Sequence, residues 1–276
     1  MKPVYYNLRI YEEKTLAAIG HYLEGLVGAN ERRGTVLGLS GGIDSALLAT
    51  LLVRIYGPEW VHGVYLYDQD SDSRLAVNAR SLAENLGIRF STRSIEPEMR
   101  VQGIYHPLPM RITRRWAILN RFLYRLYTIL AGESPFMTTL RIGSAEMDEM
   151  DSRYKFYRNA YKATEKAFNT RHIFRRRILE QLAEESNAIL LGAANRSEWK
   201  IGWFVKDGVD DVAHQPLKGL YKTQIRQLSE YLSLPSQIRI QKPSPDMRKG
   251  ITDEFAIGMS YQQLDILLDH LQSGKD

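Results

Sequence analysis

The stretch from residue 35 to residue 50, TVLGLSGGIDSALLAT, limits the possible folds of this chain more than any other. A short apolar run that ends in glycine is typical of a strand buried in a parallel sheet, and the spacing after Ser45 is helical. The turn between such a strand and its helix lies at the edge of the sheet where ligands bind. Gly41 and Gly42 lack a Cβ, so backbone N–H groups there can approach a phosphate closely. We therefore expect a phosphate-binding turn at the start of the helix, where unpaired N–H groups and the helix dipole attract anions.

Three side chains of this turn extend the prediction. Ser40 and Ser45 add hydroxyl donors, whereas Asp44 would repel a phosphate unless a cation lay between them. Carboxylate oxygens are preferred ligands of Mg²⁺, so we expect Asp44 to hold Mg²⁺ beside the phosphates. The alternative is that Asp44 or Ser45 serves only as the N-cap of the helix.

The rest of the chain alternates strand and helix patterns. Apolar residues at helical spacing predict a first helix within residues 11–28. The other patterns are strands over residues 61–67, 89–95 and 188–193 and helices over residues 45–57, 72–87, 170–186 and 222–234. This order is typical of an α/β fold with a doubly wound parallel sheet and helices on both faces. We expect a single domain over residues 1–276.

Residues 98–168 interrupt the alternation, and we expect them to form a mostly helical insertion. Residues 110–130, MRITRRWAILNRFLYRLYTIL, interleave arginine with aromatic and aliphatic side chains, and residues 146–168 are charged and rich in tyrosine. Basic helices with aromatic residues can bind nucleic acid or anionic lipid. More often they are amphipathic helices whose arginines extend to solvent while the aromatic rings pack on a partner, and we favour this interpretation.

Composition excludes several classes of protein. The chain of 276 residues has no cysteine, which excludes disulfides, thiolate metal sites and a cysteine nucleophile and fits a cytoplasmic protein. No segment is long and apolar enough to span a membrane, and the first residues lack the apolar core of a signal peptide. The net charge of +5 suits both nucleic acid and polyphosphate ligands, so charge alone does not separate the two.

The glycine turn belongs to neither of the two commonest phosphate-binding motifs. A Walker A loop needs a lysine after its last glycine, and a Rossmann loop needs GxGxxG. The residues SGGIDS resemble instead the SGGxDS loop of the N-type ATP pyrophosphatases, whose fold is adenine nucleotide alpha hydrolase-like. The resemblance implies that the loop holds the β- and γ-phosphates of ATP. AMP is then transferred to an oxygen of the substrate, and pyrophosphate leaves.

Four later blocks narrow the resemblance to the ammonia-dependent NAD synthases. They are LLGAANRSEWKIGW at 190–203, PLKGLYKTQIRQLSEYLSLP at 216–235, QKPSPDM at 241–247 and GITDEFAIGMSYQQLDILL at 250–268. The resemblance implies an ATP- and Mg²⁺-dependent amide ligase. Such an enzyme adenylates a carboxylate, deamido-NAD by default, and ammonia then displaces AMP to give NAD.

The resemblance leaves alternatives open and also implies an assembly. The same chemistry could act on another small-molecule acid, or the chain could be an RNA-modifying or sulfur-transfer member of the superfamily. The absence of cysteine argues against sulfur transfer, so we expect no nucleic-acid partner. A nucleotide-binding protein without activity is the last alternative. In the family the acyl substrate lies at a two-fold interface, which implies a homodimer.

The resemblance assigns roles residue by residue. The expected ATP site consists of Gly38, Leu39, Ser40, Gly41, Gly42, Ile43, Asp44, Ser45, Lys222 and Ser244. Asp44 and Glu198 match the two carboxylates that hold Mg²⁺, and with Lys222 they are the expected catalytic residues. A lysine beside the phosphates supplies the electrostatic stabilisation that this step needs. The substrate-side candidates are Asn169, Arg175, Lys206, Asp210 and Asp211.

Most of these assignments have a simpler alternative. Glu198 could be a solvated acid, Lys222 one more exposed lysine, and Ser244 part of a turn between two prolines. Asp253 and Glu254 precede a short helix, and for these two residues a role in capping the helix is as well supported as a role in function.

The departures from the family pattern gather on the substrate side. Ala193 replaces a threonine, Ile173 replaces an arginine, and the positions of two aspartates fall on Val209 and Ala213. The chain also lacks a basic segment expected near its end. Each buried polar group of a substrate that loses its partner costs about 1–3 kcal/mol. We therefore expect normal ATP binding but weak or absent amidation of deamido-NAD, unless other residues line the acyl pocket. The available replacements are Lys206, Asp210, Asp211, Arg114, Arg115 and Arg171.

Overall fold

The computed structural model describes residues 8–30, 32–105, 116–143, 152–244 and 250–273. Its centre is a four-stranded, fully parallel sheet in the order β3-β2-β1-β4. The strands are β1 (Thr35–Gly38), β2 (Val61–Tyr67), β3 (Arg89–Ser94) and β4 (Ile189–Leu191). The four predicted strands are thus present, although β1 and β4 end two residues earlier than expected.

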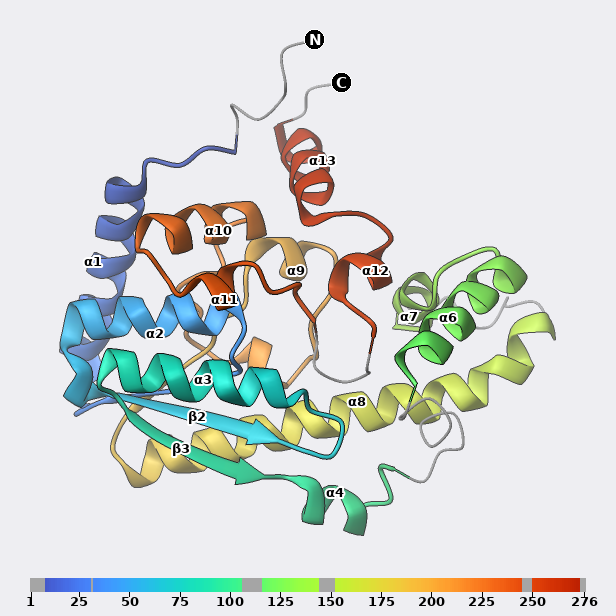
Figure 1. The fold of residues 1–276 in the computed structure, drawn as a ribbon, viewed down its shortest axis with the longest axis horizontal. Coiled ribbons are helices and arrows are strands. Elements are labelled where there is room, and N and C mark those ends of the chain that lie inside the picture. The colour runs from blue at the N-terminus through green and yellow to red at the C-terminus, as the bar shows by residue number, and fades with distance from the viewer. Residues whose placement is uncertain (1–7, 31, 106–115, 144–151, 245–249, 274–276) are drawn as a thin grey trace.

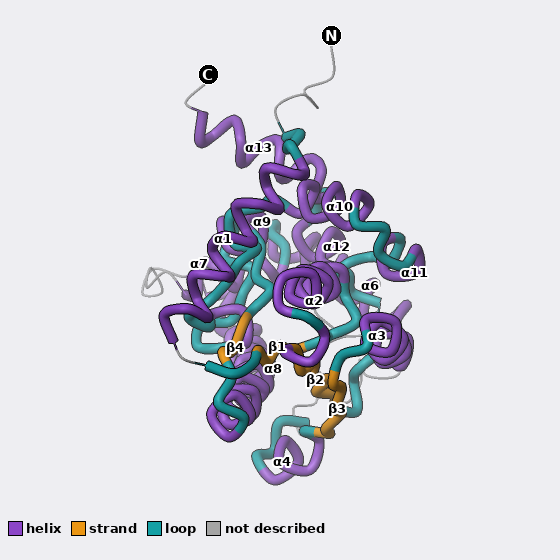
Figure 2. The backbone as a smooth tube through the Cα atoms, turned by 90° about the vertical axis from the view of Figure 1, so that its left-hand side faces the viewer, coloured by secondary structure: helices purple, strands orange, loops and turns teal. Residues whose placement is uncertain are grey.

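Helices cover both faces of the sheet, which confirms the doubly wound arrangement (Figure 2). Leu37 of β1 belongs to a core cluster with the helices of one face, whereas its neighbour Val36 packs with Ile178 and Leu179 below the other face. This division follows from the alternation of side chains along a strand. The first face carries α1 (Glu12–Asn30), α2 (Ile43–Tyr56), α3 (Ser73–Leu86), α10 (Lys222–Tyr231) and α11 (Ser236–Arg239). The second carries α4 (Glu96–Val101) and α8 (Ser152–Glu185).

The described residues of the expected insertion are helical beyond α4. They form α6 (Ala117–Ala131), α7 (Pro135–Gly143) and the first part of α8. Since α8 is one continuous helix, the helix predicted over residues 170–186 is its carboxyl-terminal half. Figure 1 shows α6 and α7 beyond the sheet, on the side of α12 (Asp253–Ile257). Arg114, Arg115 and residues 146–151 lie outside the described residues.

The remaining elements lie toward the carboxyl edge of the strands or in their connections. They are the 3₁₀ turns η2 (Pro58–Trp60) and η4 (Val209–Asp211) and the helices α9 (Arg196–Lys200) and α13 (Tyr261–Ser273). Both α9 and the first turn of α10 contact α13, and this contact lies beside the turn that leads from β1 into α2. Of the helices that the structure describes, none is long and apolar enough to cross a membrane.

Candidate active site

The turn between β1 and α2 has the backbone geometry expected of a phosphate-binding loop. Gly41 has a φ of +80°, and a Cβ there would lie 2.2 Å from the backbone oxygen of Leu75, so this position requires glycine. Gly42 is the N-cap of α2 and has no side chain to cap it. The alternative that Asp44 or Ser45 is the N-cap is therefore wrong, and both side chains are available for other contacts.

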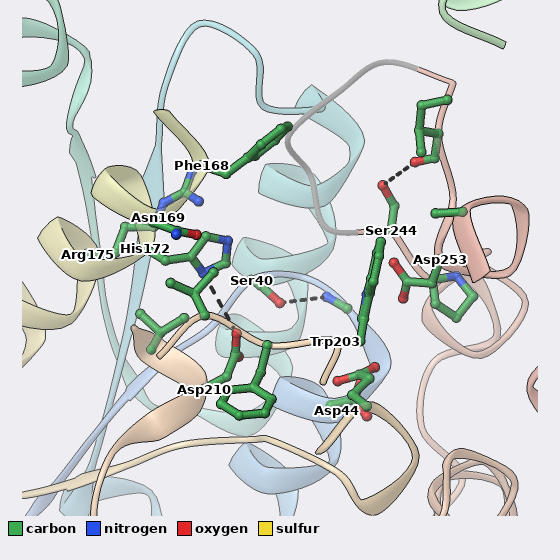
Figure 3. A pocket seen from close by; sticks show the side chains of 18 of the residues that line it. Ser40, Asp44, Phe168, Asn169, His172, Arg175, Trp203, Asp210, Ser244 and Asp253 are labelled. Carbon is green, nitrogen blue, oxygen red and sulfur yellow. Dashed lines mark hydrogen bonds and ion pairs between the residues drawn. The ribbon is translucent and has the colours of Figure 1, made fainter. Parts of the chain in front are cut away.

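Two serine hydroxyl groups hold the turn closed. The Oγ atoms of Ser40 and Ser45 lie 3.0 Å apart, and Ser45 Oγ donates to the carbonyl oxygen of Gly42 at 3.2 Å. The N–H of Gly42 donates to Ser40 Oγ at 3.3 Å (Figure 3). These bonds fix the loop, and the hydroxyl groups lie at the mouth of α2, where anions are favoured.

A buried ion cluster lies beside the loop. Lys222, only 2% exposed, donates from Nζ to Asp44 Oδ2 at 2.5 Å and to Glu198 Oε1 at 2.9 Å. Burial by itself lowers the pKa of Lys222, but the nearby carboxylates of Asp44, Glu198 and Asp253 outweigh it and raise that pKa above its ordinary value. Lys222 is therefore charged, and the alternatives of an exposed lysine and a solvated Glu198 are wrong.

Neighbouring side chains fix the two ends of this cluster. Asn195 is the N-cap of α9: its Oδ1 accepts from the N–H of Glu198 at 3.0 Å, and its Nδ2 donates to Asp44 Oδ1 at 3.0 Å. The N–H of Lys222 donates to Ser197 Oγ at 2.8 Å, and Ser197 Oγ donates to Asp265 Oδ1. The starts of α9 and α10 are therefore locked to each other and to α13, which sets the position of both charged side chains.

A third carboxyl group belongs to the cluster through a tyrosine. The hydroxyl of Tyr261 lies 2.9 Å from Glu198 Oε1 and 3.0 Å from Asp253 Oδ2. Burial first, and the negative charge of Glu198 second, raise the pKa of Asp253 to about 7. The N-cap of α12 is Thr252, so Asp253 does not cap this helix but faces the cluster. Glu254 instead accepts from the N–H of Tyr261 at 3.0 Å.

Substrate-side candidates lie across from this cluster, on α8 and on the segment after α9 (Figure 3). Asn169, Arg175, Lys206 and Asp210 line one cavity together with His172, which the sequence analysis missed. His172 Nδ1 lies 3.7 Å from Asp210 Oδ2. Burial, followed by the charge of Arg175, lowers the pKa of His172 to about 3, so the ring is neutral. Burial, followed by repulsion from Glu198, raises the pKa of Asp210 to about 7.

Two of the expected substrate contacts lie elsewhere. Asp211 is not among the residues that line the cavity, and its Oδ2 accepts from the N–H of Asp207 at 3.0 Å. Arg171 is fully buried and donates to Asp68 at 3.1 Å and to Asp70 at 3.2 Å. It ties α8 to the segment after β2 and is not a replacement on the cavity wall, which corrects that expectation.

One cavity of about 1250 Å³ joins these groups. Its loop side is formed by residues of the β1–α2 turn, Glu198, Lys222, Ser244 and Asp253, and its α8 side by Asn169, His172, Arg175, Lys206 and Asp210. Among the expected ATP residues, Leu39 and Gly41 do not reach the cavity wall, since Leu39 packs in the core. Single ligand pockets usually measure roughly 300–1000 Å³, so this cavity is larger than most pockets for one small ligand.

Comparisons with known proteins identify the family of this chain. The sequence matches the NAD synthase family over residues 15–106 and 135–276. The chain belongs to the NAD synthase family. The NH(3)-dependent NAD(+) synthetase of Coprothermobacter proteolyticus is 35% identical over 93% of this chain and 84% of its own length. That of Thermotoga maritima is 34% identical over 88% of this chain and 82% of its own length.

Solved structures of this kind share the fold. An NMN synthetase from Francisella tularensis matches with a TM-score of 0.68 and 24% identity, over 95% of this chain and 87% of its own. The NH3-dependent NAD synthetase from Campylobacter jejuni matches with a TM-score of 0.61 and 20% identity, over 96% of this chain and 85% of its own. The chain is thus an enzyme of the NAD synthase family, which uses ATP.

The departures from the NAD synthase pattern reach the cavity at only some positions. Ala193 and Val209 line it, whereas Ile173 and Ala213 do not. Among the proposed replacements, Lys206 and Asp210 line the α8 side. We expected amidation of deamido-NAD to be weak or absent unless replacement residues lined the pocket. Because two of the named replacements do line the cavity, the departures from the family pattern do not by themselves predict that amidation is lost.

Three residues of this site were missed by sequence reasoning. The spacing of Asn195 three residues before Glu198 is typical of a helix start and indicated its capping role. Tyr261 reaches Glu198 across 63 residues, and His172 meets Asp210 only through the packing of α8 on η4. Neither pairing has a local sequence signal.

Proposed function

We propose that the chain is an ATP-dependent ligase that amidates deamido-NAD with ammonia and releases NAD, AMP and pyrophosphate. The observation that carries the proposal is the single cavity in which the β1–α2 turn and the Lys222 cluster face the α8 side. Its relatives at 34–35% identity are NH(3)-dependent NAD(+) synthetases, which supports the same reaction.

In the first step, a carboxylate oxygen of the acid attacks the α-phosphorus of ATP, the bond to the β-phosphate oxygen breaks, and pyrophosphate leaves. We assign the β- and γ-phosphates to the turn, where the start of α2 and the hydroxyl groups of Ser40 and Ser45 favour anions. Lys222 lies at the side of the turn with a fixed positive charge. A preorganised cation stabilises the charge that develops on the leaving phosphates.

The residues around Lys222 also fit a magnesium ion. Asp44 Oδ2 and Glu198 Oε1 already converge on one cation, the ammonium group of Lys222, at 2.5 and 2.9 Å. Oxygen ligands of this kind suit Mg²⁺, which when bound neutralises phosphate charge. Within the described ranges no three His, Asp or Glu side chains are arranged to hold a metal. We therefore propose that Asp44 and Glu198 would hold Mg²⁺, which leaves Lys222 to the phosphates.

In the second step, the nitrogen of ammonia attacks the carbonyl carbon of the acyl adenylate, the bond to the AMP oxygen breaks, and the nitrogen loses a proton. Asp210 faces the cavity from the α8 side, and its raised pKa makes it a better proton acceptor than an ordinary aspartate. Arg175, Asn169 and Lys206 line the same side and can bind the phosphates and hydroxyl groups of the dinucleotide.

The second candidate is the same chemistry on another small-molecule acid. The observation that favours it is the position of Val209 on the cavity wall, where the family pattern has an aspartate.

We also infer a homodimer, because large aromatic side chains of the insertion such as Trp116 and Phe122 are 65% and 60% exposed and two-fold pairing is the commonest assembly. Sedimentation as a monomer at micromolar concentration would contradict the dimer.

A pyrophosphate-release assay tests the proposed function. The protein is incubated with ATP, Mg²⁺ and one acid of a panel that contains deamido-NAD, its nicotinate mononucleotide half and an aliphatic carboxylate, with and without ammonium. We expect steady release with deamido-NAD only when ammonium is present, with one NAD formed for each pyrophosphate. Release with another acid and none with deamido-NAD would favour the second candidate, and release without any acid would contradict both.

A further inference from the structure

Helix α6 lies outside the segments that match the family but forms part of the cavity wall. The family match stops at residue 106 and resumes at residue 135, whereas α6 covers Ala117–Ala131. Side chains from about three successive turns of α6 line the cavity: Asn120, Leu123, Tyr124, Leu126, Tyr127 and Leu130. A segment outside the residues that the family match covers therefore borders this cavity.

The cavity face of α6 is largely apolar. Tyr124 donates its hydroxyl hydrogen to the carbonyl oxygen of Ala256 at 2.8 Å, and the hydroxyl of Tyr127 lies 2.8 Å from Thr138 Oγ1. These bonds tie α6 to α12 and to α7. Because the two hydroxyl groups are engaged in them, both tyrosines contribute mainly their aromatic rings to the cavity wall. Leu123, Leu126 and Leu130 provide the rest of the surface. Phosphates and other strongly hydrated groups would lose hydrogen bonds to water against such a wall without finding new ones, so their binding there is unfavourable.

The end of α6 near α7 borders the α8 side of the cavity. Phe136 of α7 packs edge-on against Trp203 with ring centroids 4.9 Å apart (Trp203 is labelled in Figure 3). Leu140 lies so close to Gly202 that a Cβ there would be 3.0 Å from it. Gly202 and Trp203 lie in the same segment as Lys206, a few residues before it, so α7 rests on the segment that carries this substrate-side residue.

We propose that Leu126, Leu130 and the Tyr127 ring form a specificity wall that contacts the aromatic ring of the acid to be adenylated and does not contact ATP. The proposal rests on the proposed function and names the part of the substrate that this chain selects. Leu126 is 37% exposed, and a flat ring that covers it gains hydrophobic contact. The carboxylate on that ring is left to face the polar groups across the cavity.

Helix geometry provides a matched control. Residues 123, 126, 127 and 130 share one side of α6 because they are three or four positions apart. Ile129 is 78% exposed and is not among the lining residues. Leu126→Asn and Ile129→Asn therefore place the same polar group at a lining position and at a solvent-exposed position of one helix.

The test measures pyrophosphate release by the full chain and both variants with deamido-NAD, nicotinate mononucleotide and an aliphatic carboxylate, and MgATP affinity by calorimetry. We expect Leu126→Asn to raise the KM for the aromatic acids about tenfold, the scale of one altered apolar contact. Its MgATP affinity and unfolding temperature stay near those of the wild type. Ile129→Asn should match the wild type throughout.

Several results would overturn the wall. They are an unchanged KM in Leu126→Asn, an equal rise in Ile129→Asn, or wild-type turnover of the aliphatic acid as efficient as that of the aromatic ones. Failure of the proposed function is a separate result. If the wild type uses nicotinate mononucleotide and not deamido-NAD, the same KM comparison is made with that acid and still decides whether the wall exists.

Discussion

The loop side and the α8 side of the cavity are built in different ways. On the loop side, Asp44 and Glu198 both contact Lys222, and Asn195 bonds to both acidic residues. On the α8 side, Asp210 and His172 are 3.7 Å apart, which is too far for a hydrogen bond. The loop side is preorganised for a charged ligand of fixed shape, whereas the α8 side leaves polar groups for the substrate to engage. Changes on the two sides should therefore affect different kinetic constants.

The largest effect is expected from Asp44. Asp44→Asn removes one of the two carboxylates that we assign to Mg²⁺ and leaves Lys222 with a single close acidic partner. We expect pyrophosphate release to fall by at least roughly 10³-fold, while the circular dichroism spectrum stays that of the wild type. Asp207→Asn, an exposed change of the same chemistry, is the control. Undiminished turnover in Asp44→Asn would remove Asp44 from the site.

Lys222 should give the next largest effect. If its charge stabilises the leaving phosphates, Lys222→Ala lowers kcat by roughly 10²–10³, the scale for the loss of one preorganised electrostatic contact. Steady-state kinetics with saturating MgATP measure this change, and Lys200→Ala, which removes an exposed lysine, controls for net charge. A rise in KM without a change in kcat would mean that Lys222 binds ATP equally in the ground state and the transition state.

A pair of adjacent aspartates tests the α8 side. Asp210 lines the cavity, whereas Asp211 bonds to the backbone of Asp207. We expect Asp210→Asn to lower kcat/KM for ammonium about 10²-fold, the lower end of the range for general acid–base catalysis, and to leave MgATP affinity unchanged. Asp211→Asn should stay within about twofold of the wild type. Equal losses in the two variants would show that the loop shape, and not the Asp210 carboxyl, matters.

The smallest effect concerns the stability of the fold. Burial raises the pKa of Asp253 to about 7, against an ordinary value of 3.8, so the folded protein binds more protons than the unfolded chain between these pH values. The contribution of Asp253 to stability is therefore full below about pH 4 and declines as the pH rises through 7. Between pH 5 and pH 8 we expect the wild type to lose about 2–3 kcal/mol more unfolding free energy than Asp253→Asn. Urea denaturation at both pH values measures the difference, and parallel losses in the two proteins would contradict it.

The same contrast explains how much the sequence could predict. The strand, the glycine turn and the helix over residues 35–56 are contiguous, and each has a local signal in apolar spacing and glycine positions. The parallel sheet followed from the alternation of elements. Arg171 is buried against Asp68, which lies 103 residues away in the sequence. The packing of α6 on α12 depends on a hydrogen bond between Tyr124 and Ala256, which are 132 residues apart. Such contacts arise from tertiary packing and leave no periodic pattern in the sequence.

The resemblance located the charged residues of the loop side but not their mutual contacts. Asp44, Glu198 and Lys222 come from three distant segments, and only the folded chain shows that the lysine lies between the two acids. On the α8 side, sequence position did not distinguish Asp210 from Asp211, because one residue of rotation in η4 decides which carboxyl faces the cavity.

The most direct test of the account follows an oxygen atom. Deamido-NAD labelled with ¹⁸O in its carboxylate is converted with MgATP and ammonium, and the AMP produced is examined by mass spectrometry. If the acid and ATP meet in the one cavity, the carboxylate oxygen attacks the α-phosphorus and leaves with AMP, so each AMP carries one ¹⁸O atom. AMP without the label would mean that water, and not the carboxylate, attacks ATP, and this result would contradict the adenylation mechanism.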